Sequence, residues 1–352
     1  MSIMEFLQKA VEDKASDVFI IAGLPVSMRV HGKIVNISED MLKPDQTEAL
    51  IREIYELAAD RNMDAFVENG DDDFAFALPG LSRFRVNAYK QRGSLSAVVR
   101  VITFELPDPK ALGIPDKILD YCKFSKGLVL VTGPAGSGKS TTLACLIDNI
   151  NKNQDKHIIT LEDPLEFLHR HNRSIVSQRE ISVDTNSYVT ALRASLRQSP
   201  DVVLLGEMRD YETIQVAMTA AETGHLIFST LHTIGAANTI DRIIDVFPPN
   251  QQRQIAVQLS MVLQAVVTQQ LVPAADGGMI PAFEIITVNP AIRNMIRDNK
   301  VPQIDGLIYS AANDELVSMD AWLVKLYKEG KITGEVALAY SSNPEMMKKR
   351  MG

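Results

Sequence analysis

Hydrophobic and polar positions alternate over short runs through the first hundred residues. Residues 16–36 follow this alternation around a Gly-Leu-Pro turn signal and predict two antiparallel strands. Residues 44–68 have a helical pattern, and residues 74–102 contain three further strand-like runs separated by glycine-containing turns. The pattern therefore predicts a small α+β domain that ends near residue 103.

A proline-rich stretch follows this domain. Residues 104–116, "FELPDPKALGIPD", hold three prolines in thirteen residues and few packed apolar positions, which is typical of an interdomain linker. We therefore expect a first domain over residues 1–103 and a second domain over residues 117–352.

The second domain has a different pattern. Short, nearly continuous hydrophobic runs alternate with helical segments, and the runs read "KGLVLVTG", "KHIITLED", "PDVVLLGE" and "GHLIFSTLH". Such strands are typical of a parallel sheet covered by helices on both faces. From about residue 290 the pattern is helical and polar. The prediction is an α/β domain with a helical C-terminal appendage.

Composition narrows the class of protein. Of the 352 residues 46% are hydrophobic, and no apolar run approaches the roughly 20 residues that a membrane-spanning helix needs. Acidic residues interrupt the first fifteen positions, where a secretory signal requires a basic start and an apolar stretch. Cys122 and Cys145 are too few for a disulfide framework or a four-thiolate zinc site. We expect a cytosolic protein.

The net charge of −8 and the sequence pI near 5.4 argue against a nucleic-acid-binding surface. A strongly acidic chain is repelled by phosphate backbones unless it carries a local basic patch. The expected partner is therefore a protein.

The clearest chemical motif is "GPAGSGKS", residues 133–140, which matches the pattern G-x-x-x-x-G-K-[ST] between a predicted strand and a predicted helix. Its glycines permit backbone conformations that turn several N–H groups towards one point, and the helix adds its N-terminal dipole. A lysine charge then lies between the β- and γ-phosphates, and the Ser140 hydroxyl is a ligand for Mg²⁺. The expected nucleotide-binding residues are Gly133, Pro134, Ala135, Gly136, Ser137, Gly138, Lys139, Ser140 and Thr141.

Acidic side chains follow two of the predicted strands. Glu207 ends "DVVLLGE", and Glu162, Asp163 and Glu166 follow "HIITL". Ligands of parallel α/β sheets bind beyond the carboxyl ends of strands. We expect Glu162 to orient and deprotonate the attacking water, and Glu207 to support the metal with Ser140. The reverse assignment stays open, as does a helix-capping role for Glu207.

Several basic residues are further candidates. Arg193 and Arg197 lie at i, i+4 spacing in a helix-like stretch, where two like charges repel unless anions meet them. The anions are the acidic strand ends or a neighbouring subunit, and a solvated face is the alternative. Arg209 follows Glu207 by two positions.

Two histidines, His225 and His232, flank the last hydrophobic run. Side chains alternate along a strand, and an odd separation places these two on opposite faces. A shared metal site is therefore not expected, and His225 is expected to be a hydrogen-bonded structural residue.

Four segments together resemble the Walker A, Asp-box, Walker B and His-box of the type II/IV secretion ATPases: "GPAGSGKSTTLA", "TLEDPLEFLH", "PDVVLLGEMRD" and "AETGHLIFSTLHT". Three more segments, "SRFRVNAYKQRG", "QQLVP" and "NPAIRNMIRDNKV", are similar to those of the branch that retracts type IV pili. The resemblance covers nearly the whole chain. It implies a PAS-like N-terminal domain and a RecA-like ATPase domain, assembled as a homohexamer with nucleotide between subunits.

The resemblance also implies residue roles. His232 would sense the γ-phosphate, and arginines of the first domain would reach a neighbouring subunit's phosphates, with Arg83, Arg85, Arg92 and Arg100 in the matching segment. From the residues alone these arginines form a basic strand face. The retraction motif is Ala291, Ile292, Arg293, Asn294, Met295, Ile296, Arg297 and Asp298. By periodicity this segment is an amphipathic surface helix with its isoleucines on one stripe.

The implied function is a motor ATPase that uses ATP and Mg²⁺ to power pilus retraction and twitching motility. It would act on an inner-membrane platform protein from the cytoplasmic face, with a paralogous pilus ATPase as a further partner and no nucleic acid. The chain has no four-cysteine zinc insertion and no extra N-terminal domain, which favours retraction over extension. The alternatives are an accessory paralogue of the retraction motor, a nucleotide-binding regulatory module with weak hydrolysis, and a nucleic-acid translocase.

Overall fold

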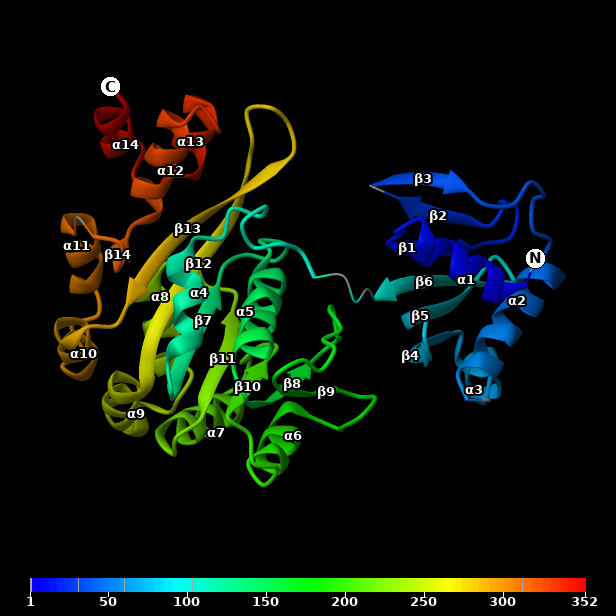
Figure 1. The fold of residues 1–352 in the computed structure, drawn as a ribbon, viewed down its shortest axis with the longest axis horizontal. Helices are drawn as coiled ribbons and strands as arrows, with labels where there is room; N and C mark the ends of the chain where they lie inside the picture. Colours follow the sequence, from blue (N-terminus) through cyan, green and yellow to red (C-terminus); the bar gives the residue numbers. More distant parts are fainter. Residues whose placement is uncertain (1, 31, 60, 103, 105, 312) are drawn as a thin grey trace. The chain divides into compact units, whose positions relative to one another are not determined.

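The computed structural model describes the chain except for Met1, His31, Asp60, Thr103, Glu105 and Ala312 (Figure 1). The chain divides into two compact units. Unit 1 comprises residues 1–105 with 165–168, and unit 2 comprises residues 106–164 with 169–352. Thr103 and Glu105, at the expected domain boundary, lie outside the described residues.

Unit 1 is an antiparallel six-stranded sheet with helices on one face. The sheet order is β3-β2-β1-β6-β5-β4. Its core joins Leu7 of α1 and Ile51 of α2 to Val86 and Val99 of the central strands. The elements are α1 (Ile3–Glu12), β1 (Asp17–Ile20), β2 (Ser27–Val30), β3 (Lys33–Asn36), α2 (Pro44–Leu57), α3 (Asp64–Asn69), β4 (Asp71–Leu78), β5 (Ser82–Gln91) and β6 (Ser94–Ile102).

The stretch predicted as two strands, residues 16–36, forms three. Gly32 adopts a φ of 78° between β2 and β3, a left-handed conformation that glycine reaches without steric cost. The three later strands, over residues 71–102, agree with the predicted runs. The prediction missed the strand at Lys33–Asn36 because the second turn lacks an Asn-Gly or Pro-Gly signal.

Unit 2 is built on an eight-stranded sheet of order β14-β13-β12-β7-β11-β10-β8-β9 (Figure 1). The neighbouring strands β12, β7, β11, β10, β8 and β9 run parallel to one another. Strand β13 runs antiparallel to both of its neighbours, β12 and β14. The prediction of a parallel sheet was therefore incomplete. The strands are β7 (Gly127–Thr132), β8 (His157–Glu162), β9 (Ile175–Glu180), β10 (Val202–Leu205), β11 (Leu226–Leu231), β12 (Leu263–Pro273), β13 (Met279–Thr287) and β14 (Leu316–Val317).

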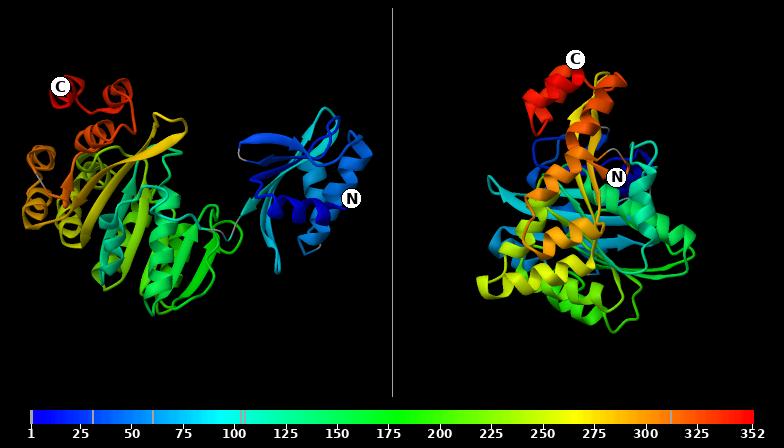
Figure 2. Two further views of the ribbon diagram at one scale, coloured as in Figure 1. Left: turned by 45° about the horizontal axis from the view of Figure 1, so that its top comes forward. Right: turned by 90° about the vertical axis from the view of Figure 1, so that its left-hand side faces the viewer.

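Helices cover both faces of this sheet, as expected (Figure 2). On one face α5 packs Leu146 and Ile150 against Val129 and Phe228. The other face lies under α6, α7, α8 and α9. The helices are α4 (Asp116–Leu119), α5 (Lys139–Asn153), α6 (Tyr188–Ser195), α7 (Tyr211–Glu222), α8 (Ala236–Asp245), α9 (Pro249–Val262), α10 (Pro290–Arg297), α11 (Gln303–Ser310), α12 (Met319–Lys328), α13 (Gly334–Tyr340) and α14 (Pro344–Met351).

The last five helices form the expected C-terminal helical region, which also contains the short strand β14. Helices α12, α13 and α14 share a small apolar core with Val272 and Ala282 of the β12–β13 hairpin. Among the described residues, none of the helices combines the length and the apolar character that a membrane crossing requires.

The proline-rich stretch differs from a solvated linker. Residues from Leu106 onward group with unit 2, and Ile114 is 5% exposed in the same apolar core as α5. The apolar residues of this stretch are too widely spaced in the sequence to predict a strand or a helix. Ile114 nevertheless packs into the core of unit 2.

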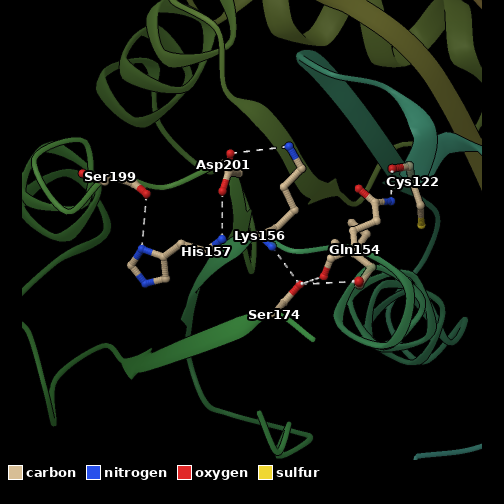
Figure 3. Close-up of polar contacts among 8 residues, drawn as sticks. Cys122, Gln154, Lys156, His157, Ser174, Ser199 and Asp201 are labelled. Carbon is tan, nitrogen blue, oxygen red and sulfur yellow. Dashed lines mark hydrogen bonds and ion pairs between the residues drawn. The ribbon is translucent and has the colours of Figure 1, made fainter. Parts of the chain in front are cut away.

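Polar contacts fix the amino-terminal edge of the sheet (Figure 3). The Ser174 hydroxyl donates to the Gln154 carbonyl oxygen at 2.7 Å and accepts from the Lys156 N–H at 3.3 Å. The Asp201 carboxylate accepts from the His157 N–H at 2.8 Å. These bonds tie the end of α5 to the start of β8, and the start of β8 to the residue before β10.

Candidate nucleotide site

The loop between β7 and α5 holds the expected phosphate-binding residues. Gly133, Gly136 and Gly138 have φ values of 140°, 76° and 86°. A Cβ atom on Gly133 would collide with the carbonyl oxygen of Gln269. The loop therefore requires glycine both for its backbone angles and for its close packing, and this geometry turns N–H groups towards one point.

Lys139 and Ser137 are buried within this loop. Lys139 is 8% exposed, and its Nζ donates to the carbonyl oxygens of Gly133 at 2.9 Å and Pro134 at 2.8 Å. Ser137 is 2% exposed, and its Oγ makes no hydrogen bond to any residue that the structure describes. Ser140 and Thr141 lie in the first turn of α5, where the helix dipole favours an anion. Phosphate oxygens would accept hydrogen bonds from the Lys139 ammonium group and from the hydroxyls of Ser137, Ser140 and Thr141.

The acidic residues and His232 meet at the carboxyl edge of the sheet. Strands β7, β11, β10 and β8 are neighbours and parallel, so the phosphate loop, His232, Glu207 and Glu162 follow their ends. Between the last two strands the backbones are close, because a Cβ on Gly206 would lie 3.4 Å from the Glu162 Cα. The sequence prediction that these groups share one edge agrees with the structure.

Glu207 and His232 are hydrogen-bonded to each other. The His232 Nε2 donates to the Glu207 Oε2 at 3.0 Å, and Arg209 forms an ion pair with the other carboxylate oxygen. The Glu207 side chain is 13% exposed, whereas that of His232 is 58% exposed. The carboxylate is thus held in place by two side chains, and sequence reasoning did not foresee either contact.

Burial and nearby cations favour the neutral form of His232. Desolvation is the largest cause, followed by the charges of Lys139 and Arg209, and together they lower the pKa of His232 below its usual 6.5. Lys139 of the phosphate loop is thus one of the charges that act on His232. A neutral imidazole bonded through Nε2 carries its lone pair on Nδ1.

The remaining polar candidates are more scattered. Asp163 is exposed, and Glu166 belongs to the segment that groups with unit 1. Helix α6 ends at Ser195, so Arg193 lies in its last turn and Arg197 beyond it, which corrects the predicted shared helical face. In the described part of the chain, no ion pair joins either arginine to the acidic strand ends.

His225 is half-buried and hydrogen-bonded, which is compatible with the structural role expected for it. Its Nδ1 bonds to the Ala220 carbonyl oxygen at 2.9 Å, and its backbone N–H donates to the same oxygen at 3.1 Å. It therefore closes the C-terminal end of α7. Residues 225 and 232 flank β11 at opposite ends.

Of the four candidate arginines of unit 1, Arg83, Arg85 and Arg100 lie on the sheet face opposite the core residues Phe84, Val86 and Val99. Arg85 pairs with Asp73 at 2.7 Å, and Arg100 pairs with Asp17 at 3.2 Å. Arg83 is half-buried on the same face of β5, and Arg92 occupies the β5–β6 turn with a φ of 49°. The strand face that the sequence predicted to be basic thus also carries aspartates, which form ion pairs with Arg85 and Arg100.

The segment of the expected retraction motif is helix α10 and its cap. Ile292 and Ile296 are buried, and Met295 packs beside them, as the periodicity predicted. Arg293 donates to the carbonyl oxygens of Ser260 at 2.6 Å and Met261 at 3.1 Å. Among the residues that the structure describes, Arg297 bonds only to Asn294 of its own helix, at 2.8 Å, and to the adjacent Asp298. The two arginines therefore differ in their contacts, since Arg293 joins α10 to α9 and Arg297 does not.

A cavity of about 480 Å³ opens beside the first turn of α5. Gly138, Thr141 and Thr142 line it on the loop side. Its apolar walls include Leu112, Ile114, Leu271, Met279 and Pro281. An apolar cavity next to a phosphate loop suits a flat nucleobase. Sequence reasoning missed this wall, because part of it comes from the presumed linker and part from the unpredicted β12–β13 hairpin.

The donors near the loop also suit a magnesium ion. No cluster of three or more His, Cys, Asp or Glu residues suited to a metal occurs in the described parts of the chain. Mg²⁺ usually binds one or two protein oxygens and takes its other ligands from phosphates and water. The Ser140 hydroxyl and the Glu207 carboxylate are hard oxygen donors of this kind.

Comparison with known proteins places the chain among relatives of similar length. A family model described as "Type II/IV secretion system protein" matches residues 1–300. The "Type IV pilus retractation ATPase PilT" of Pseudomonas aeruginosa PAO1 is 43% identical over 98% of this chain and 99% of its own length. The "Type IV pilus ATPase PilU" of the same strain is 38% identical over 97% of this chain and 89% of its own length.

A solved structure is similar over the full chain. The crystal structure of "the Pilus Retraction Motor PilT and Bound ADP" has a TM-score of 0.90 and 45% identity, covering 99% of both chains. The predicted fold class, a sheet domain followed by a RecA-like ATPase domain with C-terminal helices, is thereby confirmed.

Proposed function

The chain belongs to the family of type II/IV secretion system proteins and is an ATPase, and we propose that it is the motor that retracts type IV pili. The observation that carries the proposal is the 43% identity to a retraction ATPase over nearly the full length of both chains. The phosphate loop, the acids and His232 lie together at one edge of the sheet, as a nucleotide hydrolase requires.

In this proposal the nucleotide lies across the loop and the cavity. The base occupies the cavity of about 480 Å³, and the phosphates displace the bonds that Lys139 makes to the loop carbonyls. The buried Ser137 hydroxyl gains a partner in the same step. Ser140 and Glu207 would hold Mg²⁺, which would supply positive charge to neutralise the phosphates.

Two carboxylates divide the catalytic work. Glu162 orients and deprotonates the attacking water, and Glu207 supports the metal. Its bond to His232 and its ion pair with Arg209 hold Glu207 in one orientation. His232 in turn responds to the γ-phosphate, because the loss of that charge changes the balance between Lys139, Glu207 and the imidazole.

The motor is proposed to assemble as a ring of six, with nucleotide between subunits. The PAS-like domain, residues 1–103, presents its basic strand face to a neighbour, where Arg83, Arg85, Arg92 and Arg100 are candidates to contact phosphates. To contact phosphates, Arg85 and Arg100 must give up their ion pairs with aspartates and pair with phosphate oxygens instead. Residues 291–298 couple the ring to an inner-membrane platform protein at the cytoplasmic face.

Purified protein tests the enzymatic core of the proposal. The wild-type chain is expected to hydrolyse ATP only with Mg²⁺ and without stimulation by DNA. Glu162→Gln should reduce kcat by about a hundredfold or more, with little effect on ADP binding, because it removes the group that positions water. Glu207→Gln should in addition raise the Mg²⁺ concentration needed for half-maximal rate.

Three outcomes would count against this account. Tight ATP binding with negligible turnover by the assembled wild-type protein would indicate a regulatory module. Activity that appears only with a second pilus ATPase would indicate an accessory motor. A larger Mg²⁺ effect of Glu162→Gln than of Glu207→Gln would reverse the two catalytic assignments.

A further inference from the structure

One buried polar side chain next to the phosphate loop has no role in the account so far. Gln269 is 3% exposed and lies on β12, a strand whose neighbouring residues Val266 and Val267 are fully buried. Burial of an amide in apolar surroundings destabilises the fold unless its polar atoms are hydrogen-bonded. The hydrogen bonds and packing contacts of Gln269 therefore indicate its role.

Gln269 contacts the loop region at three points. Its Oε1 accepts from the Thr142 hydroxyl at 2.7 Å, and Thr142 lies in the first turns of α5, 1% exposed. Its backbone carbonyl oxygen packs directly against Gly133. Its Nε2 lies 2.9 Å from the position that a Cβ on Gly138 would take. Both outer glycines of the loop and the start of the helix thus rest on one residue.

The strand that carries Gln269 is anchored along its length. At one end the Gln264 Oε1 accepts from Arg293 of α10 at 3.0 Å. Nearer the loop, the hydroxyls of Thr268 and Thr132 are 3.0 Å apart across β12 and β7. Gln269 therefore cannot move freely with the loop, and it gives the loop a fixed support.

The same side chain lines the cavity assigned to the base. Gln269 thus lies where the base site and the phosphate site meet. A support at this junction fixes the distance between the two sites, and a displacement of about 1 Å at a reacting group is enough to reduce turnover strongly.

We propose that Gln269 is a positioning residue that holds the phosphate loop and the first turns of α5 against β12, through Thr142 and the two outer glycines of the loop. The proposal rests on the proposed ATPase function. It assigns Gln269 no contact with the reacting atoms.

The test is a double-mutant cycle between Gln269 and Thr142. Gln269→Met keeps the volume and removes the amide, and Thr142→Val removes the hydroxyl. Each is expected to weaken binding of a fluorescent ADP analogue by about tenfold or more, as for the loss of a buried hydrogen bond, and to lower kcat for ATP. The double variant should be no weaker than the weaker single variant, since both remove the same contact.

Two controls separate positioning from a loss of fold. Gln270→Met changes the neighbouring residue of β12, which is half-buried and has no assigned contact, and should leave ADP binding and kcat unchanged. Thr142→Ser retains the hydroxyl and should restore ADP binding, even if Gln269→Met proves unstable in thermal unfolding.

Wild-type ADP binding and kcat in Gln269→Met would overturn the proposal, as would losses that add in the double variant. ADP binding can be measured whether or not the chain hydrolyses ATP, so failure of this proposal can be told from failure of the proposed function. A wild-type chain that binds ADP but does not hydrolyse ATP would contradict the ATPase function alone, and the ADP cycle would still decide the role of Gln269.

Discussion

At the scale of single residues, the chemistry depends on pairs that the sequence keeps far apart. Glu207 and His232 are joined by a hydrogen bond of 3.0 Å across 25 positions, and Gln269 and Thr142 by one of 2.7 Å across 127 positions. The phosphate loop was predictable because its residues are contiguous. These pairs were not, because their proximity depends on the strand order.

The hydrogen bond between His232 and Glu207 predicts a pH dependence. The pKa of His232 is lowered, so its imidazole gains a proton only in more acid solution than an ordinary histidine does. Protonated His232 would attract Glu207 more strongly and draw it from the metal. ATP turnover should therefore be retained near neutral pH and fall in acid solution.

The measurement is a profile of kcat from pH 5 to 8 for the wild type and His232→Asn. The variant should bind ADP normally, turn over ATP more slowly, and lack the acid step assigned to His232. An identical acid step in both proteins would assign it to another group, and unchanged hydrolysis together with unchanged motility would remove the sensor role of His232.

At the scale of elements, the predictions held where one signal dominated. The four apolar runs of unit 2 became β7, β8, β10 and β11, because a buried parallel strand needs hydrophobic side chains on both faces. Strand β12 was missed because α9 runs into it at residues 262–263 without glycine or proline. β9, "IVSQRE", was missed because it lies at the sheet edge and is half polar.

Ser174 gives a prediction for the amino-terminal edge of the sheet. Its hydroxyl is buried and bonds to the end of α5 and to the start of β8 (Figure 3). Ser174→Ala should lower the free energy of unfolding by about 1–2 kcal/mol, because two backbone groups lose a partner. Chemical denaturation measures this change. ADP affinity should be unaltered, since the phosphate loop lies at the opposite edge, and a large loss of affinity would contradict that separation.

Helix α10 gives a prediction that separates its two arginines. Arg293 caps the end of α9, so Arg293→Ala should destabilise the protein by roughly 2 kcal/mol. In the described part of the chain Arg297 bonds only within its own segment, and it is exposed, so Arg297→Ala should change stability by less than about 0.5 kcal/mol.

If residues 291–298 contact the platform protein, Arg297→Ala should nevertheless impair twitching motility while ATP hydrolysis is retained. Thermal unfolding, the ATPase rate and surface motility measured on both variants decide this. Normal motility in Arg297→Ala would show that this side chain takes no part in coupling.

At the scale of the whole molecule, the sequence predicted an N-terminal α+β domain, an α/β ATPase domain and C-terminal helices, and the similarity to a solved retraction motor confirms this fold class. The wall of the base cavity was not predictable, since its residues come from the presumed linker and from a hairpin more than 150 positions further along. Composition and periodicity report which residues are buried, but not which distant segments share a cavity.

The central claim is that this ATPase retracts pili, and deletion of its gene in the host tests it most directly. Surface pili are counted by electron microscopy and surface motility is scored, with wild-type and Glu207→Gln chains returned to the deleted strain. A retraction motor should leave the deleted strain with more pili and without motility, and the wild-type chain, but not Glu207→Gln, should reverse both changes. Cells without pili would show that the chain powers extension instead, and an unchanged number of pili would contradict a primary role in retraction.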